Sequence, residues 1–144
     1  MAVSTEEQQA YGSSLPVTIS NAIVRVIREY TGRGPGRART TIRDNVVLVM
    51  LEQNMSKGEQ SLTAMGRGQA VLAIRREYQE AIRQESSDRI AELTGCRVNA
   101  MLSANHLDPD LAAEIYVLDS PPNYDDRTWE KLTDIPVTED QGLT

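Results

Sequence analysis

The sequence predicts an α+β fold, in which a four-stranded, mainly antiparallel sheet carries two helices on one face. Two observations predict this class. Two segments with helical periodicity alternate with two pairs of apolar segments, in the order αββαββ. Each pair is joined by a short polar turn of the kind that connects the strands of a β-hairpin. We expect a single domain over residues 15–119, between a mobile N-terminal tail (1–14) and an acidic, proline-containing C-terminal tail (120–144).

The first helix is predicted over residues 16–31. Its apolar residues recur at three- and four-residue steps, as on the buried side of an amphipathic helix. Ser13 or Ser14 is placed to cap the start of the helix, and Gly32 to end it. The apolar stripe consists of Ile19, Ile23, Val26, Ile27 and Tyr30.

The first hairpin follows a loop, residues 32–39, that contains three glycines and a proline and therefore cannot be helical. The dipeptide Asp44-Asn45 accepts the positive φ that a tight turn requires. The run of apolar residues after it suits a strand that is buried on much of both faces. We therefore expect Arg39–Arg43 to pair antiparallel with Val46–Glu52.

The second helix is predicted as one long helix over residues 57–93, because this segment contains no proline and is rich in helix-forming residues. Gly66 and Gly68 indicate close packing or a kink within it. Its many charged residues recur at helical spacing and are most simply a solvated face.

The second hairpin is predicted from two alternating segments around a polar turn. In residues 96–104, Val98, Ala100 and Leu102 alternate with more polar neighbours, which indicates a half-buried strand. Residues 111–119 resume as a strand, with Ala113, Ile115 and Val117 on one face.

Two helices on one face leave the other face of the sheet open. Met50, Met101 and the apolar run Val46–Leu51 indicate that this face, or an edge, is covered by another subunit, because large bare apolar surfaces are uncommon in monomers. We therefore expect a homodimer.

The glycine- and arginine-rich loop is a candidate anion site, because backbone N–H groups and guanidinium groups hold phosphate-like anions. It matches neither of the glycine motifs of nucleotide-binding folds, and the alternative is a solvated loop whose arginines pair with acids elsewhere. We also expect the acidic C-terminal tail, with Trp129, to lie over this loop. The candidate anion site consists of Arg33, Gly34, Gly36, Arg37, Arg39 and Arg43.

The turn between the last two strands is a candidate metal site, since His106, Asp108 and Asp110 offer one nitrogen and two carboxylate ligands. The alternative is a local turn in which the two aspartates accept hydrogen bonds from backbone amides. Catalysis is not expected, because the one histidine and the one cysteine, Cys96, lie at opposite ends of a strand. No cofactor is expected.

The composition limits the class of protein. Only 4% of the residues are aromatic and the net charge is −6, so a nucleic-acid surface is not expected. The single cysteine fits a reducing cytoplasm. No apolar run approaches the ~20 residues that span a bilayer, and the first residues lack a secretory signal. We expect a cytoplasmic protein without direct membrane insertion.

Five segments together resemble a known family. They are Tyr30–Pro35, Asp44-Asn45, Leu51-Glu52, Asn105–Asp110 and Glu114–Leu118. In this order they resemble the MpsC-like proteins, named for a sodium-translocating membrane-potential-generating system and formerly a domain of unknown function. The similarity covers roughly residues 20–119. It implies a small cytosolic bacterial protein linked to a bicarbonate-uptake, membrane-energising system, with no established catalytic residues.

Two functions are compatible with these observations. The first is a non-enzymatic accessory or regulatory protein that dimerises and docks on a membrane transport complex, with a link to inorganic carbon transport, or on another protein partner. The second is a sensor that binds a small anion or a nucleotide through the arginine loop.

Overall fold

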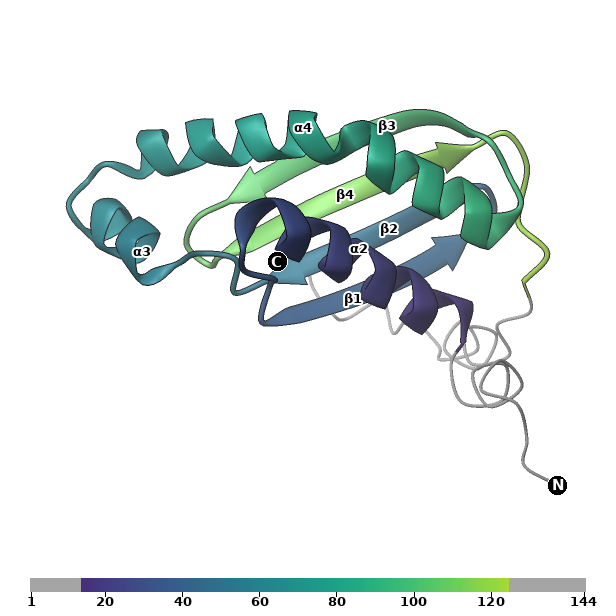
Figure 1. Ribbon diagram of the computed structural model, residues 1–144, viewed down its shortest axis with the longest axis horizontal. Coiled ribbons are helices and arrows are strands. Elements are labelled where there is room, and N and C mark those ends of the chain that lie inside the picture. Colours follow the sequence, from purple (N-terminus) through teal and green to yellow (C-terminus); the bar gives the residue numbers. More distant parts are fainter. Residues whose placement is uncertain (1–13, 125–144) are drawn as a thin grey trace, which may run out of the picture.

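The computed structural model describes residues 14–124. Within them an antiparallel sheet is covered by helices on one face, which confirms the predicted α+β class (Figure 1). The two predicted tails lie largely outside the described residues, and Trp129 with them. In chain order the elements are α2 (Leu15–Thr31), β1 (Arg37–Arg43), β2 (Val46–Glu52), α3 (Lys57–Ala64), α4 (Gly68–Thr94), β3 (Val98–His106) and β4 (Leu111–Leu118).

The sheet has the strand order β1-β2-β4-β3, and every neighbouring pair is antiparallel. The two predicted hairpins are therefore joined through β2 and β4, which form the centre of the sheet, while β1 and β3 form its edges. Asp44 in the first hairpin turn has the predicted positive φ of 51°. The most apolar strand, β2, lies in the centre because there it has a neighbour on each side and helices above it.

Helix α2 begins where its cap predicts. Ser14 accepts a hydrogen bond from the backbone N–H of Val17, and Gly32 ends the helix with a φ of 76°. The predicted stripe faces the sheet except at Tyr30, which is exposed at the last turn. A hydrogen bond of 2.7 Å between the hydroxyl groups of Ser20 and Thr40 joins α2 to β1.

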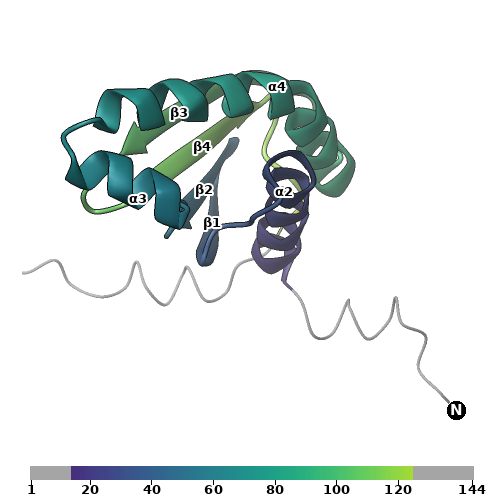
Figure 2. The same cartoon turned by 60° about the vertical axis from the view of Figure 1, so that its left-hand side comes forward.

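The prediction of one long helix over residues 57–93 is wrong, because two helices occupy this segment. Gly66 adopts a φ of 79° and ends α3, a conformation that costs glycine nothing. Helix α3 has its own capping box, in which Ser56 and Glu59 bond each other's backbone N–H groups. Figure 2 shows α3 packed at one end of the domain and α4 running along the sheet.

Helices α2 and α4 lie on the same face of the sheet, α2 beside β1 and α4 beside β3, and they also contact each other (Figures 1 and 2). The core between them and the sheet is mainly aliphatic, as the composition predicts. Its buried residues are Ile19, Ile23, Ile42, Val47, Val49, Leu51, Ile90, Met101, Ala112, Tyr116 and Leu118.

Strand β3 differs from its predicted pattern. A register irregularity between Val98 and Ala100 changes the alternation, so that Met101 is buried and Leu102 is 57% exposed. The prediction that Ala100 and Leu102 belong to the buried side of this strand is therefore wrong. In β4, Ala113, Ile115 and Val117 share a face as predicted, but the alternate residues, Glu114 among them, face the helices.

The face of the sheet opposite the helices is called the open face below. Its residues follow from the alternation of side chains and the strand register. The two central strands contribute a mostly apolar strip, β3 adds small and apolar side chains, and β1 adds arginines. The open face carries Arg37, Arg39, Thr41 and Arg43 of β1, and Val46, Leu48, Met50 and Glu52 of β2. It also carries Leu111, Ala113, Ile115 and Val117 of β4, and Ala100, Leu102, Ala104 and His106 of β3.

Candidate functional site

The predicted arginine site is spread over two sides of the sheet. Arg33 lines a pocket on the helix side, whereas Arg37, Arg39 and Arg43 alternate along β1 on the open face. Arg37 and Arg43 lie about 20 Å apart, since they are six residue steps apart along an extended strand. Arg37 and Arg39 both pair with Glu52, at 3.9 and 2.8 Å. These four arginines therefore do not converge on one anion.

The two glycines of the predicted anion site pack against neighbouring side chains. Gly34 lies against Val24 and Arg28 of α2, so its lack of a side chain lets the loop approach the helix. Gly36 donates its N–H to the carbonyl oxygens of Glu52 and Gln53. This N–H is thus used within the fold, and anion binding by the loop stays a prediction, as does the proposed cover by the C-terminal tail.

The predicted metal turn is a structural junction. Asp110 accepts hydrogen bonds from the backbone N–H of Met55, at 2.8 Å, and from the guanidinium group of Arg75, at 2.5 Å. His106 Nδ1 lies 2.8 Å from the carbonyl oxygen of Pro109, and Asp108 is exposed. Within residues 14–124, His106, Asp108 and Asp110 are not part of any group of three or more potential metal ligands. Metal binding by this turn stays a prediction.

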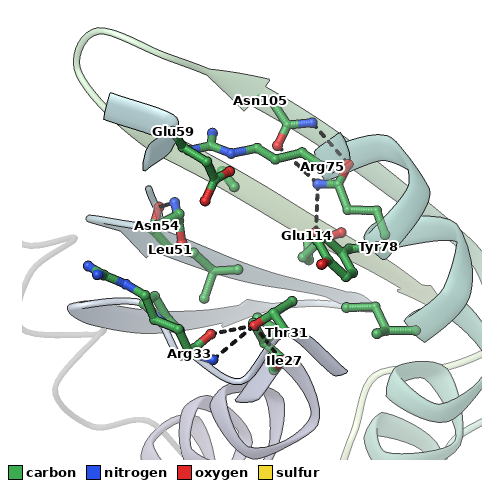
Figure 3. Close-up of a pocket in the computed structure, with 14 residues that line it drawn as sticks. Ile27, Thr31, Arg33, Leu51, Asn54, Glu59, Arg75, Tyr78, Asn105 and Glu114 are labelled. Atoms are coloured by element: carbon green, nitrogen blue, oxygen red, sulfur yellow. Dashed lines mark hydrogen bonds between the residues drawn. The ribbon is translucent and has the colours of Figure 1, made fainter. Parts of the chain in front are cut away.

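A pocket of about 90 Å³ lies on the helix side of the sheet. Figure 3 shows Ile27, Thr31 and Arg33 on one side of it and Arg75 and Asn105 on the other. The side chains come from α2, the following loop, α3, α4 and three strands, so only the assembled fold creates this space.

Glu114 forms part of the pocket wall and is 2% exposed. Its Oε1 accepts a hydrogen bond from Gln79 Nε2 at 3.0 Å, and its Oε2 accepts one from the hydroxyl group of Ser103. Both donors are neutral. Burial raises the pKa of Glu114, while the bonds from Ser103 and Gln79 and the charge of Arg83 act in the opposite direction.

The polar neighbours of Glu114 hold one another in place. Gln79 and Asn105 exchange two hydrogen bonds, of 3.1 and 2.9 Å, which fix the orientation of both amides. Arg75 also lines the pocket, but its charge is neutralised by Asp110. Among the described residues, Glu114 therefore has no ion-pair partner within 4.0 Å.

A second buried polar group lies two residues further along β4. Tyr116 is fully buried and, within the described part of the chain, its hydroxyl oxygen has no hydrogen-bond partner of normal geometry. Burial raises the pKa of this phenol. The hydroxyl group is close to Ser86, whose own hydroxyl donates to the carbonyl oxygen of Arg83.

Sequence reasoning missed Glu114. A signal was available, because Glu114 shares its side of β4 with Ala112, Tyr116 and Leu118, and an acid among apolar residues of one face is unusual. It was not recognised because the alternate set, with Ile115 and Val117, is just as apolar. Only the position of the helices decides which of the two sets is buried.

The fold and the pocket define a small α+β protein with one helix-covered sheet face and one open face. The chain matches the family described as "Na+-translocating membrane potential-generating system (MpsC)" over residues 13–120. The protein therefore belongs to the MpsC family, which confirms the resemblance noted in its sequence. No curated protein and no solved structure gave a significant match.

The family description names a system that translocates sodium ions and generates a membrane potential. In the part of the chain that the structure describes, no helix is long and apolar enough to cross a bilayer.

Proposed function

We propose that this protein is a non-enzymatic, cytoplasmic accessory subunit of a membrane-potential-generating system, and that it works as a homodimer joined through the open face. The family description supports a component of such a system; the non-enzymatic, cytoplasmic and accessory character is part of the proposal. The apolar open face, on which Leu102 is 57% exposed, supports the homodimer. The link to inorganic carbon transport rests on the family resemblance alone.

The open face is large enough for a stable dimer. Four strands spaced ~4.8 Å apart, with four same-face positions along each, cover roughly 19 by 27 Å, or about 500 Å² in projection. The accessible area of a surface with side chains exceeds its projection, and a standard interface buries ~800 Å² per partner. At ~25 cal/mol for each Å² of apolar surface, burying this face is strongly favourable.

Charge selects the orientation of the two sheets. A two-fold axis perpendicular to the strands would place the arginine row of β1 against the same row of the second copy. Two like charges 4 Å apart cost ~4 kcal/mol at an effective dielectric constant of 20. An axis parallel to the strands instead places β1 opposite β3 of the partner and keeps the two arginine rows apart.

This second orientation also fits the shapes of the side chains. Arg43 shares a row with Ala100 and Arg39 shares one with Ala104, so these two arginines of one copy face small residues of the other, while Arg37 faces His106. The alanines leave room for the arginine stems, whose guanidinium groups reach solvent at the edge. The helix side, with the mouth of the pocket, is left free for a membrane-bound partner.

Light scattering tests the dimer. The full chain should have about twice its subunit mass of 16.0 kDa at micromolar concentration. Leu102→Asp should reduce it to a monomer, because a charge would be buried in the interface. Met65→Asp is the matched control, since Met65 is 69% exposed but lies on the α3–α4 turn. A monomeric wild type, or a dimeric Leu102→Asp variant, would contradict the proposed interface.

Co-purification tests the accessory function. The tagged protein should be recovered from native membranes together with an integral membrane protein whose deletion abolishes sodium-dependent generation of a membrane potential. If deletion of the gene for this protein leaves that potential unchanged, and no such membrane protein is recovered, the accessory function is wrong. The result for the dimer is independent of this outcome.

A further inference from the structure

The pocket beside Glu114 has a chemical character that the docking function does not explain. Glu114 is a buried carboxyl group with two neutral hydrogen-bond donors, and within residues 14–124 it has no ion-pair partner. Proteins rarely bury an acid in this way, because removing a carboxylate from water is costly unless it is paired. The nearby cations have other partners or lie outside ion-pair distance. Arg75 binds Asp110, and Arg83, whose charge acts on Glu114, binds the carbonyl oxygen of Met101 and pairs with Glu80. Arg33 also lines the pocket, but among the described residues it forms no ion pair with Glu114 within 4.0 Å.

The rest of the pocket limits the size and polarity of a ligand. Ala112 forms part of its wall on the sheet side, and its small side chain leaves the space between the helices open. Ile27, Leu51 and Ile82 provide apolar walls. A volume of about 90 Å³ is several times the ~10–15 Å³ of cavity that holds one water molecule, so it suits a compact group of a few heavy atoms.

We propose that this pocket binds a small organic cation, an ammonium group on a short aliphatic body, with Glu114 as its counter-ion. The carboxylate has unused lone pairs, since each of its oxygens accepts one hydrogen bond from the part of the chain that the structure describes. An ammonium group donates up to three hydrogen bonds, so it satisfies these lone pairs and neutralises the charge. The aliphatic body contacts the isoleucine and leucine side chains.

The paired amides of Gln79 and Asn105 pre-organise this site. Their mutual bonds hold Gln79 Nε2 against Glu114, so the carboxylate is already oriented before a ligand enters. A charged donor of the ligand replaces water at a fixed acceptor, and little side-chain freedom is lost on binding. A neutral alcohol of the same size would fill the pocket without neutralising the acid.

Calorimetry with the full-length chain tests this proposal, with n-propylammonium as the probe. Three compounds are the controls. Neutral n-propanol and anionic propionate match the probe in size, and sodium chloride supplies a cation of the same charge without the aliphatic body. We expect binding of n-propylammonium at least tenfold tighter than that of n-propanol, and no heat from propionate. Equal affinity for the alcohol, heat from sodium chloride alone, or no heat from the amine at millimolar concentration would each overturn the proposal.

Variants locate the binding. Glu114→Gln keeps the shape and removes the charge, and should weaken n-propylammonium binding at least tenfold. Ala112→Leu fills the pocket and should abolish it. Glu77→Gln is the control, because Glu77 is an exposed acid on the same helix as Gln79, and it should change the affinity less than twofold. Unchanged affinity in Glu114→Gln would overturn the proposal.

A measurement on the unmodified protein covers the case in which a pocket variant fails to fold. In ¹H–¹⁵N spectra, n-propylammonium should shift the side-chain amide signals of Gln79 and Asn105, and n-propanol at the same concentration should shift them much less, because it binds more weakly. If these signals stay in place while others move, the amine binds elsewhere and the assignment to this pocket is wrong. This site is separate from the open face, so its failure and that of the dimer are distinguishable.

Discussion

Replacing Asp110 by alanine should destabilise the protein more than any exposed charge deletion, because Asp110 connects three parts of the fold. It pairs with Arg75 of α4 at 2.5 Å, and it accepts the backbone N–H of Met55 at 2.8 Å. The guanidinium group of Arg75 also lies 3.5 Å from the carbonyl oxygens of His106 and Leu111. The second hairpin, α4 and the β2–α3 connection therefore meet at this carboxylate.

The expected magnitude follows from burial. Arg75 is 8% exposed, so Asp110→Ala leaves an almost buried guanidinium group without its counter-ion. Breaking a buried ion pair from one side costs ~3–5 kcal/mol, and a lost backbone hydrogen bond costs ~1 kcal/mol. We therefore expect a loss of about 4 kcal/mol in the free energy of unfolding. Arg75→Met should cost less, about 1–3 kcal/mol, because Asp110 keeps its bond to Met55.

Urea unfolding followed by far-UV circular dichroism measures these changes, at one fixed protein concentration because the stability of a dimer depends on it. The double variant should lose less stability than the two single variants added together, since neither partner is then left unpaired. Glu92→Ala is the control: its pair with Arg89 spans 3.8 Å on the surface, and we expect a change within ~0.5 kcal/mol. If Asp110→Ala costs no more than Glu92→Ala, the assigned role is wrong.

Three further predictions concern single residues. The pKa of Glu114 is raised above its ordinary value of 4.5, so at pH values between 4.5 and the folded pKa only the folded state holds the proton. In this range the free energy of unfolding should fall with rising pH, by up to ~1.4 kcal/mol per pH unit. Urea titrations at several pH values measure this slope, which should vanish in Glu114→Gln. Tyr116→Phe should leave the stability unchanged or raise it by ~1 kcal/mol, because the hydroxyl group that it removes has no partner within the described chain. A clear decrease of the melting temperature in thermal unfolding would show that the hydroxyl group is hydrogen-bonded. Gly36→Ala should lower the free energy of unfolding by ~1–3 kcal/mol in the same assay, since the added Cβ would lie 2.8 Å from Gln53 Cβ. Gly58→Ala is the control: there is space for a Cβ in α3, so it should raise the stability by ~0.5–1 kcal/mol. Equal effects of the two variants would contradict this account.

The sequence by itself determined the elements whose signals are local. The bounds of α2 follow from a Ser14 cap, a three- and four-residue stripe and Gly32, and the structure places the helix at Leu15–Thr31. Strand β2 spans Val46–Glu52, as its apolar run and the Asp44-Asn45 turn predict. In each case the determining contacts lie within a few residues, so they can be recognised from neighbouring residues alone.

The tertiary structure decided which faces are buried and where the pocket lies. The irregularity after Val98 moves Met101 inward and Leu102 outward, because a shift of one residue exchanges the two faces of a strand. Glu114 is buried because α2 and α4 cover its side of β4, and β4 pairs with β2, more than sixty residues earlier in the chain. Such contacts depend on the packing of distant segments. For this physical reason, local periodicity predicts the strands but not the burial of Glu114.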